Sequence, residues 1–207
     1  MFHMIDRTSV AEGAVLRAMF EARKAVFVDL LKWDVPVLGG AWELDQFDDG
    51  EARYIVLVDA QGRHLGSTRL LKTTQPHILD TLFPDLCEEA IPRGPDVFEI
   101  TRFCLDRTLR AAERREVRNR LVSALAEHAL GVGIRRYTGV AEIAWFQQIL
   151  SFGWQCVPLG LPRMRDRRML AAIEIQIDAD TPRLLAEAGI WAPSPSSSLM
   201  ALEQRAA

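Results

Sequence analysis

The order of helical and strand-like patterns along the chain is the feature that most limits its fold. Three stretches carry apolar residues every three or four positions and are predicted to be helices: 10–31, 111–130 and 141–152. Five runs rich in β-branched and aromatic residues are predicted to be strands: 53–60, 64–72, 97–105, 136–140 and 169–177. Because helices and strands alternate, we expect an α/β protein, a three-layer α/β/α sandwich around a mixed, mostly antiparallel sheet.

The length of the chain predicts a single domain. Its 207 residues are 49% hydrophobic, enough for one substantial core, which we place in residues 1–193. Residues 194–207, rich in Ser, Pro and Ala, are predicted to be a flexible tail, and four prolines are expected to break regular structure over 73–95. Apolar stretches fall short of the roughly 20 residues that span a bilayer, so we expect a cytoplasmic protein without a membrane span.

Charge and cysteine content exclude several classes of function. A net charge of -3 lacks the positive field of a general nucleic-acid binder. The three cysteines are widely spaced, and the four histidines share no ligand spacing, which argues against disulfides, a metal site and metal catalysis. We therefore expect no metal and no nucleic-acid partner.

Residues 23–48 contain the densest group of charged and aromatic side chains that could form a functional site. Residues 32–50 contain Pro36, Gly39, Gly40 and a run of acidic side chains, and they predict a long functional loop. From composition alone the acidic run could be a solvated loop face. Seven residues in and before this loop fall at fixed spacings: Arg23, Phe27, Trp33, Glu43, Asp45, Phe47 and Asp48.

This spacing resembles the signature of the LuxI-type acyl-homoserine lactone synthase (autoinducer synthase) family. The similarity continues through the segments 66–70 and 98–103 and through Gly153-Trp154, over roughly the first three quarters of the chain. It implies an N-acetyltransferase-like (GNAT-like) fold. It also implies an acyltransferase that acylates the amine of S-adenosylmethionine from an acyl thioester, then closes the lactone and releases 5′-methylthioadenosine.

One position departs from the family pattern. Members usually carry Lys, Arg or Gln three residues after the signature Phe, whereas this chain has Leu30. A missing basic residue could weaken docking of an acidic acyl carrier protein, so the acyl donor stays open between acyl carrier protein and acyl-coenzyme A. S-adenosylmethionine is a substrate, and no cofactor is expected.

S-adenosylmethionine presents a sulfonium, an ammonium and a carboxylate, so its site should combine aromatic faces with acidic and basic groups. Trp33 could lie against the cation, while Asp45 and Asp48 pair with arginines. We assign to substrate binding and to the network around it Arg23, Phe27, Trp33, Asp45, Asp48, Arg69 and Phe103.

Attack by the amine on a thioester requires a base. Glu99, between Phe98 and Ile100 in a predicted strand, is our first candidate, and Arg102 and Glu43 complete the catalytic group. The alternative is that Glu99 only pairs with Arg102. Side chains 99 and 102 point to opposite faces of a regular strand, and a bulge between them would restore a common face.

The acyl chain needs an apolar wall, which we assign to Val140, Trp145, Phe146 and Leu150. Two other functions are open: another GNAT-like coenzyme A-dependent N-acyltransferase, and a non-catalytic acyl- or nucleoside-binding module. Residues 106–118 contain no glycine, unlike the pyrophosphate-binding turn of ordinary N-acetyltransferases, which favours the lactone synthase.

Overall fold

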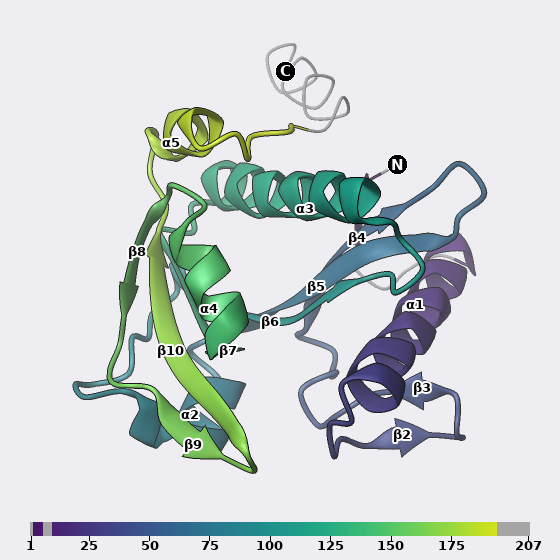
Figure 1. Ribbon diagram of the computed structural model, residues 1–207, viewed down its shortest axis with the longest axis horizontal. Coiled ribbons are helices and arrows are strands. Elements are labelled where there is room, and N and C mark those ends of the chain that lie inside the picture. The colour runs from purple at the N-terminus through teal and green to yellow at the C-terminus, as the bar shows by residue number, and fades with distance from the viewer. Residues whose placement is uncertain (1, 6–9, 194–207) are drawn as a thin grey trace. The chain divides into compact units, whose positions relative to one another are not determined.

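The computed structural model describes residues 2–5 and 10–193 (Figure 1). The predicted tail, 194–207, lies outside these residues. The chain divides into two compact units, and it passes from one to the other more than once. Of the described residues, the first comprises 2–5, 10–69, 102–124 and 192–193, and the second 70–101 and 125–191. That residues 1–193 form one domain stays a prediction.

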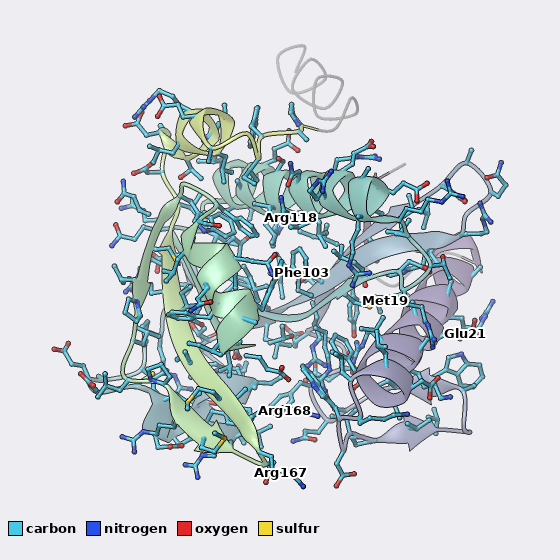
Figure 2. All side chains as sticks on the ribbon, in the orientation of Figure 1. Met19, Glu21, Phe103, Arg118, Arg167 and Arg168 are labelled. Carbon is cyan, nitrogen blue, oxygen red and sulfur yellow. The ribbon has the colours of Figure 1, made fainter. Side chains whose placement is uncertain are left out.

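The first unit contains the N-terminal helix and the polar loop that follows it. Its elements are β1 (Phe2–Ile5), α1 (Val10–Arg23), the π-helix η1 (Lys24–Leu30), β2 (Val37–Leu38), β3 (Trp42–Glu43), β4 (Arg53–Val58) and most of β5 (His64–Lys72). It also holds the last residues of β6 (Val97–Leu105) and residues 111–124 of α3 (Ala111–Val132). Met19 of α1 is buried at 1% exposure, whereas Glu21, two residues on, lies at the surface (Figure 2).

The second unit contains the rest of α3 and most of the C-terminal half. Its further elements are α2 (Ile78–Leu82), the 3₁₀ turn η2 (Pro84–Leu86), β7 (Arg136–Glu142), α4 (Ile143–Leu150), β8 (Gln155–Pro158), β9 (Arg163–Arg165), β10 (Arg168–Gln176) and α5 (Thr181–Glu187). Arg167 and Arg168 lie where β9 turns into β10 (Figure 2).

The strands hydrogen-bond in the order β1-β4-β5-β6-β7-β10-β8, and β9 pairs with β10. β6 and β7 are parallel over Val97–Ile100, whereas β10 is antiparallel to β7, β8 and β9. In the second unit, Leu79 and Leu86 pack with Ala172 on one face of the sheet. On the other face the hydroxyl of Tyr137 donates to the carbonyl of Leu125 in α3. Helical segments thus cover both faces there.

The α/β class and the mixed sheet are confirmed. β5 and β6 have the predicted bounds, and α3 and β10 differ from prediction by one or two residues. The prediction that 73–95 lack regular structure is wrong, because α2 and η2 lie there. The proline at 84 starts η2, where its missing N–H costs nothing. No helix in the part of the chain described here is long and apolar enough to cross a bilayer.

Candidate active site

The end of α1 and the start of the polar loop position one arginine and two aromatic rings. Arg23 is the last residue of α1, and the chain then widens into the π-helix that carries Phe27. π-Helical turns within helices are often found at functional sites. The N–H of Trp33 donates to the carbonyl of Phe27 over 2.8 Å, and the two rings stack 4.6 Å apart at 24°. The aromatic pair is therefore held by backbone as well as ring contacts.

Arg23 binds two of the predicted carboxylates. Its Nε donates to Oε2 of Glu43 over 2.6 Å, and its two terminal nitrogens donate in parallel to Asp48, each over 2.8 Å. Its side chain is 1% exposed and that of Glu43 fully buried. A two-pronged guanidinium–carboxylate pair has defined geometry as well as charge, so the loop residue Asp48 is held against the end of α1.

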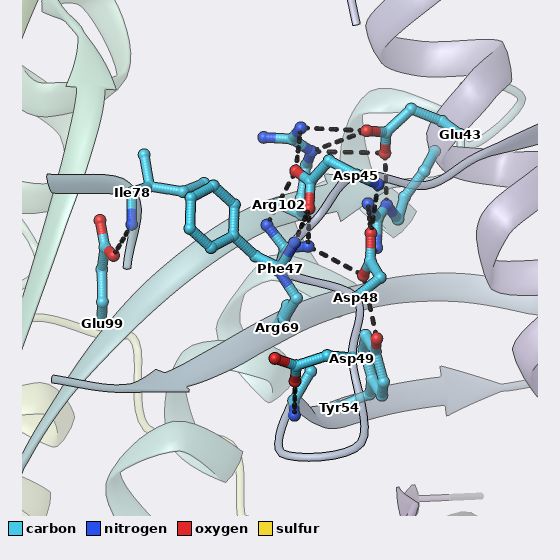
Figure 3. A network of polar contacts seen from close by, with 12 residues as sticks. Glu43, Asp45, Phe47, Asp48, Asp49, Tyr54, Arg69, Ile78, Glu99 and Arg102 are labelled. Carbon is cyan, nitrogen blue, oxygen red and sulfur yellow. Dashed lines mark hydrogen bonds and ion pairs between the residues drawn. The ribbon is translucent and has the colours of Figure 1, made fainter. Parts of the chain in front are cut away.

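Arg69 of β5 and Arg102 of β6 complete the network in the first unit (Figure 3). Arg69 donates to both oxygens of Asp45, over 2.6 and 3.1 Å. Arg102 donates through Nη2 to Oε1 of Glu43 over 3.0 Å and to Oδ2 of Asp45 over 2.7 Å. The predicted acid–base network thus consists of three arginines bridged by three carboxylates.

The loop between β3 and β4 is also held by local contacts. The backbone N–H of Asp45 donates to Asp48 over 2.9 Å, and that of Phe47 donates to Asp45 over 2.9 Å. Phe47 is buried, and its ring centre lies 5.9 Å from the guanidinium carbon of Arg69. The hydroxyl of Tyr54, which sequence reasoning missed, donates to Asp48 over 2.9 Å. A tyrosine in a strand carries no sequence signal for this role.

Burial and pairing shift the pKa values in this network in opposite directions. Burial alone raises the pKa of Asp48, but the hydrogen bonds and positive charge of Arg23, with the charge of Arg69, outweigh it and hold that pKa well below the ordinary range. Burial lowers the pKa of Arg23, yet Asp48 and Glu43 together raise it above its ordinary value. Arg23 and Asp48 are therefore both charged near neutral pH.

Arg102 has an unusual backbone. Its φ is +50°, a left-handed conformation that costs a residue with a side chain about 1–3 kcal/mol. The backbone therefore departs from regular strand geometry at Arg102. In a regular strand the side chains of residues 99 and 102 would point to opposite faces. The guanidinium carbon of Arg102 lies 5.7 Å from the ring centre of Phe27 and 5.9 Å from that of Trp33. Arg102 thus joins the carboxylates to the aromatic pair.

Glu99 lies in the second unit, in the part of β6 that pairs with β7. It is fully buried, and its oxygens accept the backbone N–H group of Ile78 over 2.8 Å (Figure 3). They also accept the backbone N–H group of Leu79 over 3.0 Å. These N–H groups belong to the first turn of α2, where helical backbone leaves donors without partners. The carboxylate therefore caps a helix that the sequence did not predict.

The four residues proposed for the acyl wall differ in their burial and in their contacts. Val140 packs at the edge of the apolar cluster formed by Leu79, Leu86 and Ala172. Phe146 of α4 is buried at 6% exposure, and the ring of Trp145 meets that of Phe152 edge-on at 5.8 Å.

Leu150, which was also assigned to the acyl wall, is 40% exposed and does not lie on the buried face of α4. Ile149, three residues after Phe146, is the buried residue at this end of α4, and the helix ends at Leu150. Phe103, the remaining predicted site residue, is half-buried in β6.

Comparison with known proteins decides the family. The model of the autoinducer synthase family matches residues 7–183. The chain belongs to this family. An acyl-homoserine-lactone synthase of Ralstonia nicotianae is 33% identical over 174 residues, which are 81% of this chain and 85% of that protein.

The structure of a coenzyme A-dependent acyl-homoserine lactone synthase, BjaI, with SAM and isopentyl-CoA is similar with a TM-score of 0.82 and 26% identity. That similarity covers 94% of this chain and 93% of BjaI. A putative N-acetyltransferase from Lactobacillus plantarum shares the fold, with a TM-score of 0.57 and 18% identity over 86% of this chain and 98% of that one. The GNAT-like fold is thus confirmed. This autoinducer synthase is an acyltransferase that makes acyl-homoserine lactone.

Proposed function

We propose that the arginine–carboxylate network and the Phe27–Trp33 pair form the S-adenosylmethionine site. The observation that carries this proposal is the stacked aromatic pair, held 4.6 Å apart beside Arg102. An aromatic face attracts the sulfonium and ammonium cations, and a guanidinium suits the carboxylate of the same substrate. Phe103 is proposed to add a further aromatic contact.

Glu99 is proposed as the base for amine acylation, with Glu43 and Arg102 positioning the substrate. The α-amine attacks the thioester carbon, the new C–N bond forms, and the C–S bond breaks to release the thiol. The substrate's carboxylate then attacks its own γ-carbon, and the bond to the sulfonium breaks. Methylthioadenosine leaves as a neutral thioether, so this second step needs correct positioning more than acid–base assistance.

For the acyl chain we propose the apolar cluster of the second unit, to which Val140 belongs, extended by Trp145 and Phe146. Apolar side chains with few polar groups suit a fatty acyl group. We exclude Leu150 from this wall because of its exposure.

Acyl-coenzyme A is our preferred donor. Two observations support it: the exposed Leu30, at 50%, where the family usually carries a polar or basic residue, and the similarity to coenzyme A-dependent BjaI. Acyl carrier protein is the alternative. We propose that the enzyme acts in the cytoplasm.

The test supplies the purified enzyme with S-adenosylmethionine and the same acyl group on coenzyme A or on acyl carrier protein. Release of methylthioadenosine and formation of lactone from the coenzyme A thioester are the expected result. Thiol release without methylthioadenosine would instead indicate a generic N-acyltransferase. Turnover only with the carrier protein would overturn the donor proposal.

Binding of S-adenosylmethionine to a Trp33→Ala variant tests the site itself. We expect calorimetry to show at least about 5-fold weaker binding, equivalent to about 1 kcal/mol for a lost cation–π contact. Trp42→Ala is the matched control, because Trp42 is half-buried and donates to the exposed Glu21 over 3.3 Å. Equal affinities in both variants would refute the proposed aromatic contact.

A further inference from the structure

The helix that begins as α1 ends at a residue with a left-handed backbone. Leu31, the residue after η1, has an ordinary φ of −84°, and its N–H donates to the carbonyl of Val26 over 2.9 Å. Lys32, the next residue, has a φ of +57°. A side chain crowds the backbone in this region, so glycine is the usual residue at such a helix end. A lysine is therefore unexpected at this position.

The left-handed residue turns the chain back onto the helix that it leaves. The N–H of Trp33 donates over 2.8 Å to the carbonyl of Phe27, six residues earlier. In the Schellman motif that ends many α-helices, the matching bond spans five residues, and the wider π-helix adds one. An apolar contact between the second residue after the cap and the last turn of the helix often accompanies this motif. Here that contact is the stack of Trp33 on Phe27, with the ring centres 4.6 Å apart.

The π-helix η1 is held in place by an ion pair and by core contacts. Lys24 and Asp29, about one π-helical turn apart, form an ion pair of 3.0 Å. Phe27 belongs to a buried cluster with the fully buried Cys104, and the ring of Trp33 packs against this cluster. The carbonyl and the ring that receive Trp33 are therefore fixed, and the backbone of the residue before it decides whether Trp33 reaches them.

Other backbone conformations at position 32 would separate the two rings. With right-handed angles the helix would continue, and Trp33 would follow its spiral away from Phe27. With an extended backbone the chain would leave the end of the helix without turning back. In neither case could the N–H of Trp33 reach the carbonyl of Phe27. The left-handed conformation therefore forms the aromatic pair beside Arg102, whose guanidinium carbon lies 5.9 Å from the centre of the Trp33 ring.

We propose that Lys32 is a positioning residue of the S-adenosylmethionine site, and that its left-handed backbone, rather than its ammonium group, holds Trp33 on Phe27. This inference rests on the proposed function of the aromatic pair. In molecules in which residue 32 leaves the left-handed region, the pair is open and the substrate cation loses the face of Trp33. The apparent dissociation constant for S-adenosylmethionine then rises as the fraction of such molecules grows.

Three substitutions separate the backbone of Lys32 from its charge. Lys32→Gly and Lys32→Asn remove the ammonium group but enter the left-handed region more easily than lysine does. Lys32→Val also removes the charge, and its β-branched side chain is strongly disfavoured in that region. Calorimetry should show affinities for S-adenosylmethionine within about twofold of wild type for the first two variants, and at least about 5-fold weaker binding for Lys32→Val. Lys32→Thr, β-branched but polar, gives the same comparison if Lys32→Val precipitates.

Two further measurements distinguish positioning from a general loss of stability. In Lys32→Val the KM for S-adenosylmethionine should rise at least about 5-fold, while kcat at saturating S-adenosylmethionine and the KM for the acyl thioester stay within about twofold of wild type. The near-UV circular dichroism of the ligand-free Lys32→Val protein should lose the part of the signal that Trp33→Ala also loses, whereas Lys32→Gly should keep it. This second measurement reports the stacking of the two rings without any substrate.

Arg167→Val is the matched control. Arg167 has a φ of +66° and lies exposed in the turn between β9 and β10 of the second unit, outside the proposed S-adenosylmethionine site. The variant introduces the same kind of backbone strain, so it should lower the midpoint of urea unfolding and leave the affinity for S-adenosylmethionine within about twofold of wild type.

Three results would overturn the role of Lys32. These are wild-type affinity in Lys32→Val, an equal loss of affinity in Arg167→Val, and losses in Lys32→Gly and Lys32→Asn as large as that in Lys32→Val, which would assign the effect to the ammonium group. Trp33→Ala in the same assay controls for the proposed function. If Trp33→Ala binds as tightly as wild type, the proposed S-adenosylmethionine site itself is wrong. If it binds weakly while Lys32→Val binds as wild type does, only the role of Lys32 is wrong.

Discussion

Arg23 and Asp48 face each other as two parallel forks, with Nη1 donating to Oδ1 and Nη2 to Oδ2, each over 2.8 Å. Both side chains are 1% exposed. A pair so completely removed from water depends on both partners, because either one alone would be a buried, unpaired charge.

Replacing Asp48 by Asn should therefore destabilise the protein strongly. The variant keeps the shape of the side chain but leaves Arg23 short of a negative charge, and we expect the free energy of unfolding to fall by about 3–5 kcal/mol. Urea unfolding followed by circular dichroism measures this. Asp49→Asn is the matched control, because Asp49 is exposed and uses Oδ1, which Asn retains, to accept two backbone N–H groups. A similar loss in both variants would contradict the importance of the pair.

His64 should make stability depend on pH. Burial lowers the pKa of His64 to about 4, and the charge of Asp106 offsets only part of this. The unfolded chain binds a proton near pH 6.5, so stability is full above that pH and falls as the pH decreases towards 4. Between pH 8 and pH 5 we expect His64 to reduce the free energy of unfolding by about 2 kcal/mol. His64→Gln should remove this part of the pH dependence, and an unchanged slope would refute it.

Gly66 lies where no side chain fits. A Cβ there would come within 2.8 Å of a methyl group of Val117 and within 3.1 Å of Leu105. Gly66→Ala should therefore cost about 1–3 kcal/mol through overpacking, measured as a shift in the urea midpoint. Gly50→Ala is the control, since nothing lies within 4 Å of a Cβ at that position. Equal stability of the two variants would show that α3 yields easily at Val117.

Glu99→Gln tests the proposed base. We expect kcat to fall about 100- to 10,000-fold. The amide places a donor opposite one of the N–H groups of Ile78 and Leu79, which should cost about 1–3 kcal/mol of stability. Glu142→Gln, whose carboxylate is 39% exposed and lies 3.3 Å from Arg168, should leave kcat within twofold. Calorimetry with S-adenosylmethionine should show binding to the Glu99 variant, and full activity in that variant would exclude Glu99 as the base.

Sequence reasoning found the members of the arginine–carboxylate network but not its connections. Three arginines and three carboxylates allow many pairings, and only the folded loop shows that Glu43 bridges Arg23 and Arg102. Five strands of the sheet, β4, β5, β6, β7 and β10, were predictable because their apolar runs end at turns. The short strands β1, β8 and β9 were not predicted.

The α2 segment was not predictable, because a five-residue helix between prolines has too few turns to display a period. The exposure of Leu150 was not predictable either, because a helix of two turns leaves its last residue free to face solvent.

The network of three guanidinium groups and three carboxylates also limits how this sequence can change over evolutionary time. Each member contacts at least two others or closes a fork, so a neutral residue at any one position strands an opposite charge away from water. We therefore expect substitutions at these positions to occur in pairs, one acidic and one basic residue changing together. A sequence in which only one member of a pair has changed would have low stability.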